Sequence, residues 1–268
     1  MTSLPLTQPQ RSALVDTSLA LLLQPEAQQL VDVVSAGDPG RRRLALRALL
    51  AMRPAIPLPA ELNVSLERLL AAEAAERETV DALSLPRPEV DPRLSLWRGD
   101  ITTIRADAIV NAANSTLLGC FQPLHACIDN AIHSAAGLAL RAECAARMEQ
   151  QGHPEKTGSA KITRGYNLPA RYVLHTVGPI VRGTLTERDK ELLASCYRSC
   201  LSCAVQHDLK SIAFCCISTG EFHFPNKEAA EIAVHEVRAF LAQNKTMERV
   251  VFNVFKDEDK EIYERLLS

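Results

Sequence analysis

The feature that most constrains the fold is an alternation of strand-like and helix-like segments from about Leu94 onward. Apolar, β-rich runs predict strands at Leu94–Arg98, Ala108–Asn111, Tyr172–Val177, Ser211–Ile217 and Val250–Phe255. Helical patterns lie between or after them, at Ile128–Gln151, Glu187–His207, Lys227–Gln243 and Asp257–Leu267. This order predicts an α/β fold whose sheet is mostly parallel and covered on both faces. Ligands of such sheets bind beyond the carboxyl ends of the strands, so the residues after each strand are the functional candidates.

The first ninety residues have a different composition from the rest of the chain. They contain no cysteine, histidine or aromatic residue and are rich in Leu, Ala and Arg. Apolar spacing predicts three or four short amphipathic helices, one of them around Leu30–Val34 and another capped by Asn63. Prolines at 86, 88 and 92 then favour a linker. We therefore expect a helical extension at residues 1–90, packed on a larger domain at residues 91–268.

Composition narrows the class of protein further. Hydrophobic residues make up 47% of the 268 and charged residues 23%, which is enough for a packed core. Thirty Lys and Arg against 32 Asp and Glu give a net charge of −2, which argues against strong nucleic-acid binding. No apolar run approaches the roughly 18 residues of a membrane span, and no secretory signal pattern is present. We expect a cytoplasmic protein that does not bind membranes.

Polar residues follow the first two predicted strands of the larger domain. The carboxylate of Asp100 could accept hydrogen bonds from an exocyclic amine such as that of adenine, although Gly99-Asp100 is also an ordinary turn. The carboxamides of Asn111 and Asn114 could bind ribose hydroxyls, and an asparagine-rich turn is the alternative. Neither segment decides a function alone.

A third segment, Ser218–Phe222, follows the most apolar strand. Its small and hydroxylated residues leave backbone N–H groups free to bind phosphate, ahead of a helix that Asn226 could cap. Phe222 would offer a flat face to a sugar or base, or would simply belong to the core. Glu221 would repel a phosphate unless it turned away or met a cation or hydroxyl, a question that the sequence leaves open.

Four motifs, in their order and spacing, resemble the macrodomain family: Trp97–Thr102, Val110–Asn114, Ala170–Pro179 and Ile217–Gly220. The resemblance spans roughly residues 94–268 and implies a three-layer α/β/α fold that binds ADP-ribose. Asp100 would hold the adenine with the Ile101 backbone nearby, and Asn114 would contact the distal ribose. The remaining contacts implied for ADP-ribose are Cys127, Ile128, Asp129, Asn130, Ser218, Thr219, Gly220, Glu221 and Phe222.

The loop after Asn114 departs from the common macrodomain pattern. Ile128-Asp129-Asn130 stands where many members have Val-Asp-Gly, and Cys120, His125 and Cys127 lie just before it. Two thiolates and one imidazole at this spacing can surround one ion, and such ligands favour zinc over magnesium or calcium. Three protein ligands leave a fourth position open, as in catalytic zinc sites. Taken alone, the same residues could be two buried thiols and a loop histidine.

The loop and the helical extension together resemble the zinc-dependent macrodomain subclass. That resemblance implies hydrolysis of mono-ADP-ribose from protein side chains, and we expect Asp or Glu linkage because an acyl ester leaves readily. Zinc would activate water or polarise the substrate; Asp129 would orient the water or act as base, while Asn114 and Asn130 would fix the sugar. The implied partners are an ADP-ribosylated protein, with a lipoyl-carrier protein as one candidate, and a sirtuin-type ADP-ribosyltransferase.

Two other functions stay open at this point. The domain could be a non-catalytic ADP-ribose reader with a structural zinc, or a hydrolase of small esters such as O-acetyl-ADP-ribose. Other candidate ligands have simpler interpretations: His133 is expected to be an ordinary helix residue and His223 a residue at the rim of the site. Cys196, Cys200 and Cys203 have helical spacing and should face a core.

Overall fold

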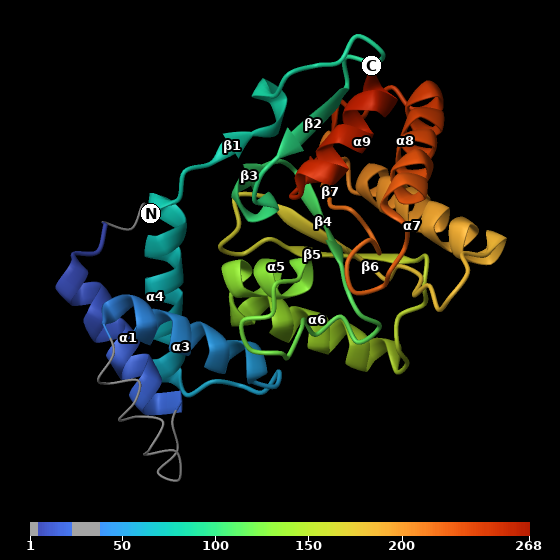
Figure 1. The fold of residues 1–268 in the computed structure, drawn as a ribbon. Coiled ribbons are helices and arrows are strands. Elements are labelled where there is room, and N and C mark those ends of the chain that lie inside the picture. The colour runs from blue at the N-terminus through green and yellow to red at the C-terminus, as the bar shows by residue number, and fades with distance from the viewer. Residues whose placement is uncertain (1–4, 23–37) are drawn as a thin grey trace.

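The computed structural model describes residues 5–22 and 38–268, so the helix expected around Leu30–Val34 lies outside the described residues (Figure 1). The described part of the extension holds three helices, α1 (Gln8–Leu22), α3 (Pro39–Met52) and α4 (Ala60–Glu76). Their apolar faces meet in a small core of their own, formed by Val15, Leu19, Leu46, Leu62, Leu66 and Leu69. The expected cap at Asn63 is wrong, because α4 begins earlier, directly after Pro59.

The larger domain is built on a six-stranded sheet in the order β2-β8-β7-β4-β6-β5. All neighbouring strands pair in parallel except β5, which runs antiparallel to β6 at one edge. The strand bounds are β2 (Leu94–Arg98), β4 (Ala108–Ala112), β5 (Ala160–Arg164), β6 (Tyr172–Thr176), β7 (Ser211–Phe214) and β8 (Arg249–Val254). The mostly parallel α/β fold is therefore confirmed. A separate two-stranded pair joins β1 (Val80–Asp81) to β3 (Ile104–Arg105).

Helices cover both faces of this sheet (Figure 1). On one side lie α5 (Ile128–Ala136) and α6 (Leu138–Gln151). On the other lie α7 (Glu187–Gln206), α8 (Asn226–Gln243) and α9 (Asp257–Leu267), which pack against each other in sequence. The central strands β7 and β8 are buried along their whole length, as expected for strands covered on two faces.

Two helix predictions need correction. The single helix expected at residues 128–151 is broken at Gly137, whose φ of 93° only glycine adopts readily. Asn226 does not cap the next helix but is its first residue after Pro225. Its Nδ2 instead donates to Asp259 Oδ1 at 2.6 Å and so ties α8 to α9.

The extension packs on the side of the larger domain that α5 and α6 cover, in contact with these two helices. Helices α3 and α4 contact α5, and the side chain of Leu138 in α6 lies against the extension core. Ala82 and Leu85, which precede the prolines, already belong to the core of the larger domain. The division at residue 90 stays a prediction.

Candidate metal and nucleotide site

The parallel strands bring the predicted nucleotide-binding segments to one edge of the sheet. Asp100 follows β2, and its Oδ1 accepts hydrogen bonds from the Thr102 backbone N (2.9 Å) and Oγ1 (2.7 Å). The Asp100 side chain is exposed, whereas Ile101 is buried. Phe255, which was not among the predicted site residues, follows the adjacent strand β8 and is 76% exposed. The sequence predicts Phe255 as the last residue of the strand Val250–Phe255, whereas β8 ends at Val254.

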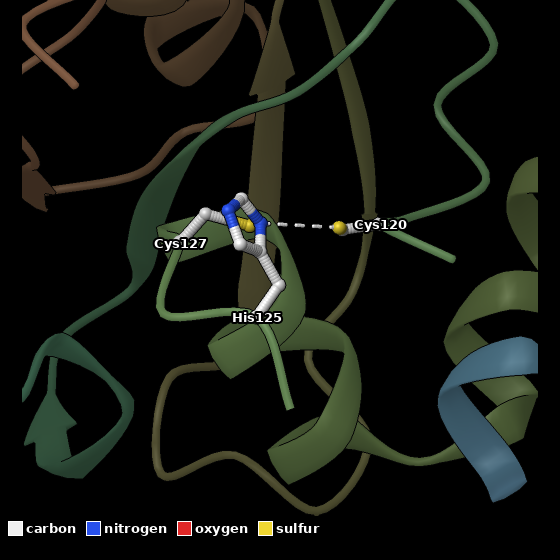
Figure 2. A group of neighbouring side chains, drawn as sticks. All are labelled: Cys120, His125 and Cys127. Atoms are coloured by element: carbon white, nitrogen blue, oxygen red, sulfur yellow. Dashed lines mark hydrogen bonds between the residues drawn. The ribbon is translucent and has the colours of Figure 1, made fainter. Parts of the chain in front are cut away.

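The three predicted metal ligands lie together in the loop between β4 and α5, as Figure 2 shows. Cys120 Sγ is 3.4 Å from His125 Nδ1, and the ligand atoms of Cys120, His125 and Cys127 all lie within 4.8 Å of one another. All three residues are half-buried. Two sulfurs and one imidazole nitrogen at these separations form a donor set that fits zinc.

Cys127 has a second role, because it caps the N-terminus of α5. Its Sγ accepts a hydrogen bond from the Asn130 backbone N at 3.4 Å. Burial raises the pKa of the Cys127 thiol to about 12, and the nearby Cys120 contributes to the rise. A cation among these ligands would offset that effect, because metal coordination favours the thiolate.

Glu221 points toward the metal loop, residues 119–127, which carries Cys120, His125 and Cys127. His125 Nε2 lies 3.4 Å from Glu221 Oε1, while the Nδ1 of the same ring faces Cys120. A proton on Nε2, shared with the carboxylate, leaves the Nδ1 lone pair available for a metal. The nucleotide loop, residues 218–222, thus carries a carboxylate that orients the histidine of the metal loop.

Asp129 lies in the first turn of α5, directly after the metal loop, and is only 5% exposed. Its Oδ1 accepts from Asn111 Nδ2 at 2.8 Å, and its Oδ2 accepts from Asn114 Nδ2 at 3.2 Å. Burial raises the pKa of Asp129 to about 6, although the Asn111 hydrogen bond and the Arg141 charge oppose this rise. Asn111 is wholly buried, so the expected contact of its amide with ribose is wrong.

The amides of Asn114 and Asn130 fasten the metal loop to its surroundings. Asn114 Nδ2 also donates to the Gly119 carbonyl at 3.0 Å, which fixes the start of the loop. Asn130 Nδ2 donates to the Gln122 carbonyl at 2.9 Å, and Asn130 is 1% exposed. The contacts of these two residues with sugar stay predictions, as does that of the half-buried Ile128 at the start of α5.

The segment Ser218–Phe222 forms a tight turn beside the end of β6. Ser218 has a φ of 66°, and its buried Oγ has no hydrogen-bond partner among the described residues. A Cβ on Gly178 would approach that Oγ to 2.0 Å, so glycine is needed there. Thr219 and Phe222 are half-buried, whereas Glu221 is exposed. An unpartnered buried hydroxyl in such a turn suits an anionic oxygen of a ligand.

A second group of potential ligands, His133, Cys144 and His175, is buried between α5, α6 and the sheet. His175 already has partners on both ring nitrogens, Asn111 Nδ2 at 3.2 Å and Thr163 Oγ1 at 2.9 Å. Burial lowers the pKa of His175 to about 4 and raises that of Cys144 to about 12. This group is better explained as a neutral polar cluster of the core than as a metal centre.

The other histidine and cysteine expectations concern residues away from the metal loop. His223 directly follows the segment Ser218–Phe222 and is exposed. Cys196 and Cys200 are buried in the core, and Cys203 is half-buried against it.

Comparison with known proteins decides the family. The model of the Macro domain matches residues 110–233. A protein-ADP-ribose hydrolase of Treponema medium is 49% identical over 86% of this chain and 89% of its own length. The chain belongs to the macrodomain family. A probable bifunctional ADP-ribose hydrolase/ADP-ribosyltransferase of Fusarium oxysporum f. sp. cubense is 43% identical over 83% of this chain, and the match spans 40% of that longer protein.

The similarity to a solved macrodomain includes the N-terminal extension. The Trypanosoma brucei macrodomain in complex with ADP-ribose is 32% identical with a TM-score of 0.62, over 100% of this chain and 98% of that one. Within the described residues, no helix is both long and apolar enough to cross a membrane.

Proposed function

We propose that this macrodomain is a zinc-dependent hydrolase that removes mono-ADP-ribose from protein side chains and releases free ADP-ribose. The observation that carries the proposal is the convergence of Cys120, His125 and Cys127 beside the buried Asp129. The name of the Treponema medium relative supports the hydrolase activity. The Trypanosoma brucei macrodomain, which was solved in complex with ADP-ribose, supports ADP-ribose as the bound group.

The metal loop supplies the reactive part of the proposed site. Cys120, His125 and Cys127 would hold zinc, with the His125 ring oriented by Glu221. Bound there, zinc supplies Lewis-acid chemistry that either activates water or polarises a substrate oxygen. Cys127 lies at the N-terminus of α5, where the helix dipole favours a thiolate.

Asp129 is the proposed proton acceptor. A carboxylate with a pKa of about 6 is a stronger base than an exposed one and is still largely ionised at neutral pH. Asn111 and Asn114 hold its two oxygens, which fixes the direction of the carboxylate. Asn130 holds the metal loop in place through the Gln122 carbonyl, and Asn130 and Asn114 would fix the sugar.

The nucleotide would extend along the carboxyl edge of the sheet. We assign Asp100 and the Ile101 backbone to the adenine and add Phe255 as a stacking face, because its ring is exposed after the strand next to β2. Ser218–Phe222 would surround the diphosphate and the distal ribose, with the unpartnered Ser218 hydroxyl turned to a ligand oxygen. Binding of the nucleotide then positions the scissile bond over the metal loop.

The finer features of the function are also proposals. Asp or Glu linkage follows from the better leaving group of an acyl ester. A functional link to an ADP-ribosyltransferase is supported by the Fusarium oxysporum relative, whose name joins both activities. A sirtuin-type transferase, a lipoyl-carrier protein as target and a cytoplasmic location rest on the resemblance and composition described above.

The deciding experiment measures release of ADP-ribose from a protein that carries mono-ADP-ribose on Asp or Glu. Wild type, Cys127→Ser and the control Cys203→Ser are compared, with and without a zinc chelator. Serine can keep the helix cap of residue 127 while removing the thiolate, and Cys203 lies on α7 outside the site. We expect turnover in wild type and Cys203→Ser, its loss on chelation and recovery with zinc, and none in Cys127→Ser.

The same assay separates the two alternatives. ADP-ribose binding without turnover would favour a reader. Equal turnover of O-acetyl-ADP-ribose and the modified protein would favour a hydrolase of small esters. Turnover that survives verified removal of zinc would make the metal structural.

A further inference from the structure

We propose that Arg141 of α6 clamps the metal-binding loop to helix α3, so that the N-terminal extension is a working part of the active site. The guanidinium would position the loop that carries Cys120, and through it the zinc ligands. The inference rests on the proposed function where it concerns zinc, and on the contacts of Arg141 where it concerns the clamp.

The first side of the clamp joins Arg141 to the extension. Arg141 is 3% exposed, and its Nη1 donates to the carbonyl of Leu50 at 3.0 Å and to the carbonyl of Arg53. Both carbonyls lie at the end of α3, where few of the last acceptors of a helix have partners within it; the Leu50 carbonyl also accepts from the Arg53 backbone N at 3.3 Å. The negative end of the helix dipole also favours a cation there. The extension therefore supplies hydrogen-bond acceptors to a buried cation of the larger domain.

The second side joins Arg141 to the metal loop. The guanidinium carbon lies 4.7 Å from the centre of the Phe121 ring, a cation–π distance. Phe121 follows Cys120 directly in the chain, so a fixed ring restrains the backbone of the first ligand. Phe121 is 39% exposed and is not part of either hydrophobic core, so packing in a core does not hold its ring in place. Burial lowers the pKa of Arg141, and the charge of Asp129 opposes this shift.

A small cavity lies beside Arg141, at the junction between the extension and the helices α5 and α6. Its lining includes Arg47, Leu50, Leu70, His133 and Arg141, from both the extension and the larger domain. Because Arg141 bridges this junction, docking of the extension and binding of zinc should be thermodynamically linked. Each should strengthen the other by the same factor.

The test compares Arg141→Lys and Phe121→Leu with Arg93→Lys as a matched control. Arg93 also donates through Nη1 to carbonyls at a helix end, Leu241 and Asn244 of the α8 terminus, both at 2.9 Å. It precedes β2 and so lies at the amino ends of the parallel strands, away from the site. Lysine keeps the charge but loses the planar fork and its stacking face. Phe121→Leu leaves a half-exposed apolar residue and does not threaten folding.

The measured quantities are the zinc dissociation constant by chelator competition, the unfolding midpoint without zinc, and kcat and KM. We expect zinc affinity to fall about tenfold in Arg141→Lys and at least about threefold in Phe121→Leu, with kcat lowered more than KM is raised. Arg93→Lys should lower the unfolding midpoint but leave zinc affinity unchanged. A double variant of Arg141 and Phe121 should bind zinc no more weakly than Arg141→Lys.

Two outcomes would overturn the inference, and they are distinguishable. If wild type binds zinc and hydrolyses substrate but the Arg141 and Phe121 variants do so equally well, the clamp is wrong and the proposed function stands. If wild type binds no zinc, the metal site and the clamp fall together.

Discussion

At the scale of single residues, burial shifts the pKa values of two side chains, Asp129 and His175. Burial shifts the pKa of a group when its hydrogen bonds do not offset the loss of contact with water. Asp129 has a raised pKa because burial outweighs its hydrogen bond from Asn111. His175 lies on strand β6, which pairs with β4. Burial lowers its pKa, because the charged form of a base is the protonated one and burial disfavours the charged form. The carboxylate is thereby prepared to accept a proton, and the imidazole is kept neutral.

Asp129→Asn tests the proton acceptor. The amide cannot take a proton, so we expect kcat to fall about 100-fold or more. Zinc affinity should change little, because Asp129 is not one of the three proposed ligands. Single-turnover release of ADP-ribose and chelator competition measure the two quantities. Retention of wild-type kcat would remove Asp129 from the chemistry.

His175 predicts a pH dependence of stability in the zinc-free protein. Its pKa is about 4 when folded and 6.5 in the unfolded reference, so the unfolded state binds a proton first as pH falls. The stabilisation is thus complete above pH 6.5 and is lost as pH falls toward 4, by about 3 kcal/mol in total. Urea unfolding of wild type and His175→Gln across this range measures it. Parallel pH curves for the two proteins would contradict the assignment.

At the scale of elements, the break between α5 and α6 allows the extension to dock. Gly137 has φ 93° and ψ 178°, a region open essentially to glycine alone. A Cβ there would come within 2.9 Å of Leu70 Cδ1, a side chain of α4. A side chain at this point would therefore collide with the extension.

Gly137→Ala should lower the free energy of unfolding by about 1–3 kcal/mol through backbone strain, and further through the clash with Leu70. Gly152→Ala is the matched control, because Gly152 also has a positive φ, 73°, but nothing lies within 4 Å of its added Cβ. Adding Leu70→Ala should recover part of the loss in the first variant only. Urea unfolding measures all of these proteins. Equal losses in the two glycine variants would argue against the packing role.

At the scale of the whole molecule, two cores are joined through one junction. The small core of the extension and the large core around the sheet meet where α3 and α4 contact α5. The two cores are unequal, and the smaller one contains no aromatic residue among the described residues. The extension therefore depends on docking, and the docked surface of α5 and α6 depends on being covered.

Removal of residues 1–79 tests this dependence. We expect the truncated protein to aggregate, because apolar side chains such as Leu138 lose their cover. Any soluble fraction should bind zinc more weakly, since Arg141 loses the acceptors at the end of α3. Size-exclusion chromatography and zinc titration provide the measurements. A soluble monomer with unchanged zinc affinity would show that the extension is dispensable.

Much of this protein could be predicted from local pattern and spacing: the alternation of strands and helices, the three potential metal ligands and the segments that follow the strands. The apolar periodicity of the strands and helices is strong, and the three potential ligands lie close together in the sequence, so local patterns were enough to find these features. The edge strand β5 escaped prediction because its five residues, Ala160–Arg164, are mixed in polarity. The break at Gly137 escaped it because the helical pattern continues on both sides.

The contacts between side chains of separate elements could be found only from the tertiary structure. Glu221 meets His125 from a distant part of the chain, Asn111 turns inward to Asp129, and Arg141 joins α3 to Phe121. Each contact depends on the distance and direction between side chains from separate elements. Sequence periodicity shows which face of an element is apolar, but the burial and pairing of a polar group depend on how the elements pack together.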